Sequence, residues 1–180
     1  MTTFVTYPGV TSGVTFDRVP ATQFSPGANG YARFVTRKTY APPLRMSGWL
    51  QLRDVWNGNK TPGNHDLDGL HVHVGHIGNA RNYVASLVRR DSHAKVAVEY
   101  GWKGYTTLKW ENAGPEFVPN RVYLFEIIWK PDKILTWLGN EVGEWTMKAK
   151  IPRGKRIPLG TVGFRLDNLI AVGDFVVGDV

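Results

Sequence analysis

The sequence predicts an all-β fold, a sandwich of two antiparallel sheets in a single domain. Three observations support this prediction. Short apolar or alternating segments recur about every ten residues, and glycine or proline separates them. No capped amphipathic helix longer than about ten residues can be recognised. The stretch from Arg121 to Val142 has the alternation and the turns of a β-meander with an apolar inner face.

The first elements follow from local composition. Residues 1–30 are rich in threonine, proline and glycine and predict an extended N-terminal arm or edge segment, so the sandwich domain is expected over 31–180. Residues 31–40 alternate as a strand, and Pro42-Pro43 should end it because proline cannot donate to a sheet ladder.

The middle of the chain predicts five further strands around a polar loop. Residues 46–56 form a strand with Trp49, Gln51 and Arg53 on one face. The loop over 57–69 is dense in turn-forming residues. Residues 70–77 place His71 and His73 opposite their valine neighbours. Residues 79–90 fit a helix or a strand, and the neighbouring strands favour a strand; 95–100 and 105–110 follow as strands.

The meander is the best-defined local structure. Pro131-Asp132 favours a two-residue turn, which would pair Lys130 with Lys133 and Trp129 with Ile134. A second turn is expected at Gly139-Asn140. Tryptophan recurs at 129, 137 and 145, but the pairing puts Trp129 and Trp137 on opposite faces, so core and sheet-to-sheet packing is expected for them instead of one stacking groove.

Composition limits the possible functions. The chain has 180 residues, enough for one buried core, and no cysteine, so disulfides do not hold it together. The net charge of +7 favours polyanionic partners, with simple solubility charge as an equal alternative because the Lys and Arg residues are scattered. No segment is long and apolar enough to cross a membrane, and the start, MTTFVTYPGV, lacks the pattern of a signal peptide.

Three segments carry a resemblance to a known superfamily: WKPDKILTWLGNEV, the later GTVGFRLDN, and the closing VGDFVVGDV. Together they resemble the concanavalin A-like lectin/glucanase jelly rolls over about four-fifths of the chain. The resemblance implies a jelly roll whose concave sheet carries the ligand face. Members of this superfamily bind glycans, hydrolyse them, eliminate uronates or hold proteins together, so the fold alone does not select among these activities.

A weaker resemblance links the chain to bacteriophage minor tail and virion accessory proteins. It rests on the threonine-rich start, the compact single domain and the lack of a signal peptide. A virion or cytoplasmic location is the corresponding expectation.

The jelly-roll resemblance would place the strands over 46–56, 70–77, 79–90 and 95–100 together in the concave sheet. Their outward positions provide an aromatic plate and planar polar groups, as in a sugar groove. A solvated polar face is the simpler alternative. The predicted ligand-binding residues are Trp49, Gln51, Arg53, His71, His73 and Arg89.

The catalytic alternative is a uronate lyase. Glycoside hydrolysis needs paired carboxylates, and the Glu-x-Asp-x-x-Glu run of the glucanases of this fold does not occur. The resemblance to uronate lyases of the same fold would assign Gln51 and Arg53 to the substrate carboxylate, His71 or His73 as the base, and Tyr83 as the acid. The signature motifs of these lyases are not present as such.

Neither a cofactor nor a metal ion is predicted. His65, Asp66, Asp68, His71 and His73 could be drawn into a metal site, but loop composition explains this cluster. The pattern of Arg33, Arg37 and Tyr31 is too short for a nucleic-acid platform, and no nucleic-acid-binding module is recognisable.

The leading functional hypothesis is a non-catalytic interaction module, a tail-associated virion protein that binds surface glycan or a neighbouring subunit. The alternatives are a polysaccharide lyase acting on an acidic glycan by β-elimination, and a purely structural subunit with an N-terminal assembly arm. Expected partners are a glycan or other polyanion and further protein subunits, including copies of the same chain; neither nucleic acid nor membrane insertion is expected.

Overall fold

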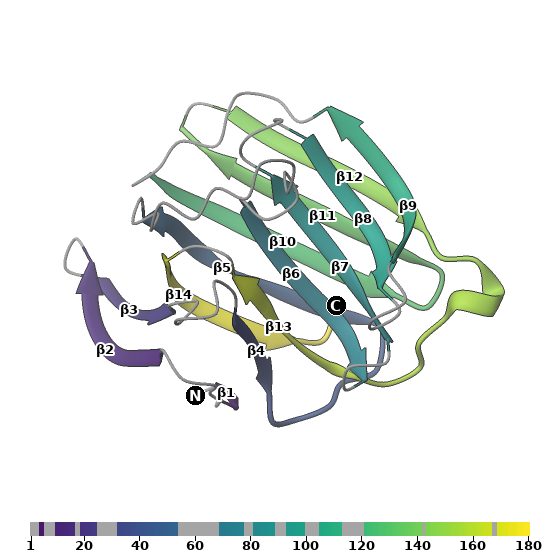
Figure 1. The fold of residues 1–180 in the computed structure, drawn as a ribbon, viewed down its shortest axis with the longest axis horizontal. Coiled ribbons are helices and arrows are strands. Elements are labelled where there is room, and N and C mark those ends of the chain that lie inside the picture. Colours follow the sequence, from purple (N-terminus) through teal and green to yellow (C-terminus); the bar gives the residue numbers. More distant parts are fainter. Residues whose placement is uncertain are drawn as a thin grey trace.

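The computed structural model shows a sandwich of two antiparallel sheets (Figure 1). It describes residues 4–5, 10–16, 19–24, 32–53, 69–77, 81–88, 93–99, 105–112, 121–141, 143–166 and 169–180. Within these residues each sheet has seven strands. The predicted all-β sandwich is therefore confirmed. No helix in the described part of the chain is long and apolar enough to cross a membrane.

The first sheet combines strands from both ends and the middle of the chain. In spatial order it contains β1 (Phe4–Val5), β4 (Ala32–Thr36), β13 (Thr161–Leu166), β6 (Gly69–Ile77), β7 (Arg81–Val88), β8 (His93–Glu99) and β9 (Tyr105–Asn112).

The second sheet is built around the meander. In spatial order it contains β12 (Gly143–Lys150), β11 (Lys133–Asn140), β10 (Val122–Lys130), β5 (Leu44–Arg53), β14 (Leu169–Gly178), β3 (Val19–Phe24) and β2 (Val10–Phe16). A short 3-10 helix, η3 (Arg153–Lys155), lies on the connection from β12 to β13.

The core lies between the sheets because alternate residues of each strand are apolar and point the same way. In β10 the alternate residues Tyr123, Phe125, Ile127 and Trp129 are each at most 4% exposed. Aromatic pairs join the two layers. The rings of Trp129 and Tyr83 meet at 6.1 Å, and those of Phe125 and Phe164 meet at 5.9 Å, both in edge-on geometries that favour aromatic contacts.

The predicted register of the first meander hairpin is confirmed. Lys130 pairs with Lys133 and Trp129 with Ile134 around Pro131-Asp132. The second turn is displaced from its predicted position at Gly139-Asn140. β11 continues through Asn140, which pairs with Gly143, and the Asn140 side-chain oxygen accepts a 3.2 Å hydrogen bond from the Gly143 N–H.

Two other local predictions can be compared with the structure. The segment over 79–90, which fitted a helix or a strand, contains the strand β7. The proline pair does separate two strands: β4 ends at Thr36, and β5 begins at Leu44 directly after Pro43.

Parts of the first thirty residues belong to both sheets, with β1 and β2 at the edges. Whether this segment acts as an assembly arm stays a prediction.

Trp129 and Trp137 have different environments. Trp129 is 1% exposed and lies in the core, as expected. Trp137 is partly exposed on the outer face of the second sheet, so the expectation that it serves core packing is wrong. The side chain of Trp145 lies outside the described part.

Candidate ligand-binding face

The predicted groove is divided between the two sheets. β5, which carries Trp49, Gln51 and Arg53, pairs with β10 and β14 in the second sheet. β6, which carries His71 and His73, belongs to the first sheet. The expectation that these strands share one concave sheet is therefore wrong for β5. Since the outer faces of a sandwich point in opposite directions, these two groups cannot line one groove.

Trp49 and Gln51 are also not open to a ligand. Both lie on the face of β5 opposite the core residues Met46 and Leu50, as predicted, yet they are only 7% and 5% exposed. The indole of Trp49 rests on Gly173, where an added Cβ atom would be 2.3 Å from the ring. Trp49 thus packs onto a neighbouring strand instead of presenting a free plate. Arg53 is placed by its backbone opposite Leu169.

His73 is fully buried as well. Its neighbours Val72 and Val74 lie in the core, so His73 lies on the outer side of the first sheet, as the alternation predicted. A bulge at Gly75, with φ of +64°, returns His76 to that same side. The two imidazoles meet edge to face at 6.2 Å.

Tyr83 has a structural role. It lies in the core, where its hydroxyl donates to the Lys155 carbonyl (2.7 Å) and accepts from the Ile157 N–H (2.9 Å). These bonds fasten the η3 segment to β7. The residues named for a lyase are therefore not brought together, because Tyr83 lies between the sheets and Gln51 belongs to the second sheet. Arg89, His65, Asp66 and Asp68 lie outside the described residues.

The strand register instead aligns a row of basic residues across the first sheet. Arg33 pairs with Arg165, Arg165 with His71, His71 with Ser86, Ser86 with Lys95, and Lys95 with Trp110. We call these six positions the basic row. It crosses β4, β13, β6, β7, β8 and β9 in that order.

The basic row lies on the outer face of the first sheet. The adjacent row along the strands contains Phe164 paired with Val72, and both belong to the core. Because successive residues of a strand point to opposite faces, the row that contains Arg165 and His71 is on the side away from the core. At the usual strand spacing of about 4.8 Å, the six positions span about 24 Å.

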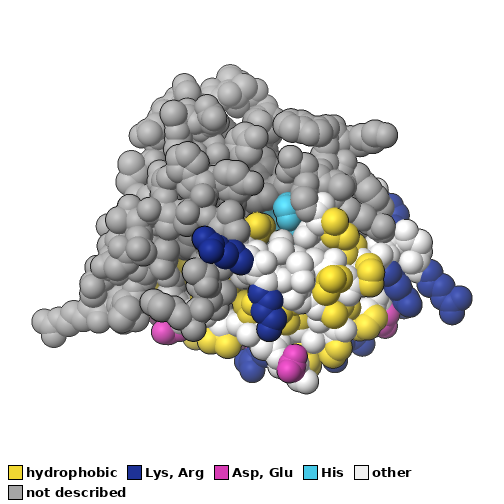
Figure 2. Space-filling view, turned by 90° about the horizontal axis from the view of Figure 1, so that it is seen from below, with side chains coloured by type: hydrophobic (Ala, Val, Ile, Leu, Met, Phe, Trp, Pro, Cys, Tyr) yellow, Lys and Arg dark blue, Asp and Glu magenta, His cyan; other side chains and the backbone are white. Residues whose placement is uncertain are grey.

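The register of the basic row places two arginines directly opposite each other. Residues directly opposite one another on neighbouring antiparallel strands have Cβ atoms about 5 Å apart, and like charges in such pairs destabilise the sheet. Arg33 and Arg165 form a like-charge pair of this kind. Like charges are also aligned on the second sheet, where Lys133 pairs with both Lys130 and Lys150. Figure 2 shows Lys and Arg side chains spread over the described part of one face, with apolar, neutral and acidic side chains among them.

The sequence prediction included His71 but missed the rest of this row. Arg33, Arg165 and Lys95 lie on three strands that are far apart in the chain, and only the pairing of those strands brings them together. Each of them occupies an outward position of an alternating strand. The alternation within each strand could be recognised in the sequence, but the register between strands distant in the chain could not.

Sequence comparison identifies no relative: no family model and no curated protein matches this chain. Solved structures do match. The carbohydrate-binding module CBM66 from Bacillus subtilis superposes with a TM-score of 0.66 at 12% identity, covering 95% of this chain and 96% of that one. A protein with a galectin-like fold, also from Bacillus subtilis, gives a TM-score of 0.65 at 12% identity, covering 93% and 86%.

A seed lectin from Lotus tetragonolobus matches the full length, with a TM-score of 0.64, 8% identity and coverage of 100% and 98%. The fold is a concanavalin A-like jelly roll. At these identities the similarity concerns the fold, and the ligand has to be argued from the residues. The resemblance to phage tail proteins stays a prediction.

Proposed function

We propose that the protein is a non-catalytic glycan-binding module that holds an acidic glycan against the outer face of the first sheet. The observation that carries this proposal is the basic row, in which four of six aligned positions are Arg, Lys or His. A row about 24 Å long suits an extended polymer better than a small molecule.

A polyanion would match the charge of the aligned basic positions. Arg33 and Arg165 stand directly opposite each other in the register, and carboxylates or sulfates of a bound chain would supply counter-charge to both. The net charge of +7 draws the same class of ligand toward the protein over longer distances. Trp110 ends the row with an aromatic residue, a type suited to a sugar ring.

The similar structures favour a glycan over other polyanions. They include proteins described by name as a carbohydrate-binding module and as a lectin. Elimination chemistry is less well supported because the residues named for it do not meet: Tyr83 is engaged in the core, and Gln51 belongs to the other sheet.

The test is a binding titration with named polymers. Alginate, hyaluronan and polygalacturonate serve as acidic probes and dextran as the uncharged one, each at low and high salt. We expect binding to at least one acidic polymer, weakened by salt because dissolved ions screen the attraction between a basic protein and an acidic polymer. The double variant Arg165→Gln/Lys95→Gln should lose about tenfold or more in affinity, which corresponds to about 1.4 kcal/mol.

The matched control is the double variant Lys133→Gln/Lys150→Gln, which also removes two positive charges, from paired positions of β11 and β12 in the second sheet. It should leave the affinity within about twofold of the wild type. An equal loss in this control would mean that net charge, and not the basic row, binds the polymer. Failure to bind any acidic polymer would refute the proposal.

We further propose a virion-associated setting, in which such a module attaches a particle to surface glycan or to a neighbouring subunit. This part rests on the sequence resemblance alone. Labelling of virus particles by an antibody against this chain would support it, and consistent lack of labelling would count against it.

A further inference from the structure

A second aromatic site lies on the opposite side of the molecule. Trp137 pairs with Glu126 of β10 and Thr146 of β12, and this row lies on the outer face of the second sheet. The six-membered ring of its indole covers Gly139, where an added Cβ atom would be 2.6 Å from the ring. The absence of a side chain at Gly139 therefore allows the ring to pack flat against the backbone of the strand.

The orientation of the ring is fixed from a second direction. The Trp137 indole N–H donates a 2.8 Å hydrogen bond to a carboxylate oxygen of Glu144 on β12. With the Gly139 contact beneath and this bond at the edge, the aromatic plate is in place before any ligand arrives. Such preorganisation lowers the entropy cost of binding.

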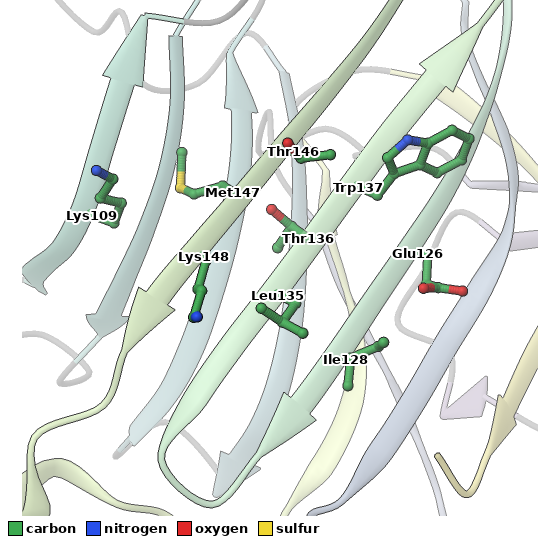
Figure 3. Close-up of a pocket in the computed structure, with 9 residues that line it drawn as sticks. All are labelled: Lys109, Glu126, Ile128, Leu135, Thr136, Trp137, Thr146, Met147 and Lys148. Carbon is green, nitrogen blue, oxygen red and sulfur yellow. The ribbon is translucent and has the colours of Figure 1, made fainter.

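Trp137 separates two hollows on this face. The larger, of about 460 Å³, extends along β10, β11 and β12, where it includes Glu126, Leu135, Thr146 and Lys148, and it reaches Lys109 on β9 of the first sheet (Figure 3). The smaller, of about 370 Å³, lies beside Leu124, Gly139 and Glu144. Both volumes fall within the range of small-molecule sites. Trp137 contributes to both hollows.

The charges around Trp137 occur in opposite pairs. The Arg45 guanidinium donates to the Glu126 carboxylate (2.6 Å), and Arg121 lies 3.8 Å from Glu141. Outside these pairs, the exposed Lys109 and Lys148 line the larger hollow, and the exposed Glu144 lines the smaller one. This balance differs from the basic row and does not favour a strongly anionic ligand.

From this geometry we infer a second binding site at Trp137 that takes an uncharged glycan. A pyranose ring stacks its C–H face on the indole, while the carboxylates of Glu126 and Glu144 and the Thr146 hydroxyl bond to sugar hydroxyls. A peptide strand fits less well, because β11 is already hydrogen-bonded on both edges and offers no free backbone edge. The site goes beyond the proposed function, since it lies on the other face and selects a different charge class.

The experiment measures dissociation constants by calorimetry for cellohexaose, maltohexaose and mannohexaose as uncharged probes, and for hexagalacturonate as a charged one. We expect at least one uncharged probe to bind. Trp137→Ala should weaken that binding by about tenfold, consistent with the loss of one aromatic contact. Trp137→Phe keeps a smaller plate and should weaken it less; it also serves if the alanine variant proves poorly folded.

Two comparisons separate this site from the basic row. Arg165→Gln should leave binding of the uncharged probe unchanged, and Trp137→Ala should leave hexagalacturonate binding unchanged. The inference is overturned if no uncharged probe binds, if Trp137→Ala binds the uncharged probe as tightly as the wild type, or if only a proline-rich control peptide depends on Trp137. None of these outcomes bears on the acidic-glycan proposal, which Arg165→Gln tests by itself.

Discussion

At the scale of single residues, two glycines determine how tryptophan side chains pack on the outer face of the second sheet. Gly173 lies under Trp49 and Gly139 lies under Trp137, and in both cases an added Cβ atom would overlap the indole. The consequences differ because Trp49 is buried and Trp137 is partly exposed. A glycine beneath the indole thus allows Trp49 to pack in a buried position and holds Trp137 flat on the surface of the sheet.

Replacing Gly173 with alanine should destabilise the fold by about 1–3 kcal/mol, because the new methyl group must displace the Trp49 ring. Gly178 lies on the same strand, β14, and an added Cβ there meets nothing within 4 Å, so Gly178→Ala is the matched control. Urea denaturation of both variants measures the difference. Equal stabilities would contradict the described packing of Trp49.

Tyr83→Phe should cost about 1–3 kcal/mol, since the variant leaves the buried Ile157 N–H without the hydroxyl that accepts its bond. Thr106→Val is the comparison, because it removes an exposed hydroxyl that accepts a hydrogen bond from the Lys155 ammonium (3.1 Å), and it should change stability little. Thermal unfolding of the two variants provides the measurement. If Tyr83→Phe left the stability unchanged, the structural role assigned to the Tyr83 hydroxyl would be wrong.

At the scale of strands, local patterns predicted the pieces but not their partners. The turn at Pro131-Asp132 is local chemistry, and its register was predicted correctly. The sheet to which β5 belongs depends on β10 and β14, which lie far along the chain, and it was mispredicted. The basic row depends on two strand pairings of this long-range kind, β4 with β13 and β13 with β6, as well as three between consecutive strands. Single-strand alternation could therefore identify His71 without finding Arg165 opposite it.

Trp137 was missed for a different reason. The predicted hairpin register correctly placed its ring on the face of the sheet away from Trp129. Tryptophan is usually well buried, and this general preference favoured a packing role. The packing of the ring on Gly139 and its hydrogen bond to Glu144 form only in the folded sheet, so the sequence alone did not reveal them.

The basic row predicts a trade between stability and binding. Arg165→Gln relieves the like-charge pair with Arg33 and should stabilise the ligand-free protein by about 0.2–1 kcal/mol at low salt, while it weakens polyanion binding. Chemical denaturation at low and high salt measures the effect, which should shrink as salt screens the repulsion. Destabilisation by this substitution at low salt would argue against repulsion within the row.

At the scale of the whole molecule, the two sheets of the jelly roll share one core, and their outer faces differ in chemistry. The first sheet aligns four basic residues within a row that crosses six strands, and the second presents Trp137 among charges of both signs. Contacts such as those between Tyr83 and Trp129 hold the layers together from inside. Substitutions on one outer face should therefore leave the other face intact, because the two are separated by packed side chains.

The central claim is that the outer face of the first sheet binds an acidic glycan. The most direct test is nuclear magnetic resonance of the backbone amides during titration with an acidic hexasaccharide such as hexagalacturonate. The account predicts the largest shift changes at the outer positions of β13, β6, β7 and β8, around Arg165, His71 and Lys95. Changes confined to the second sheet, or no changes at concentrations where an acidic polymer binds, would contradict it.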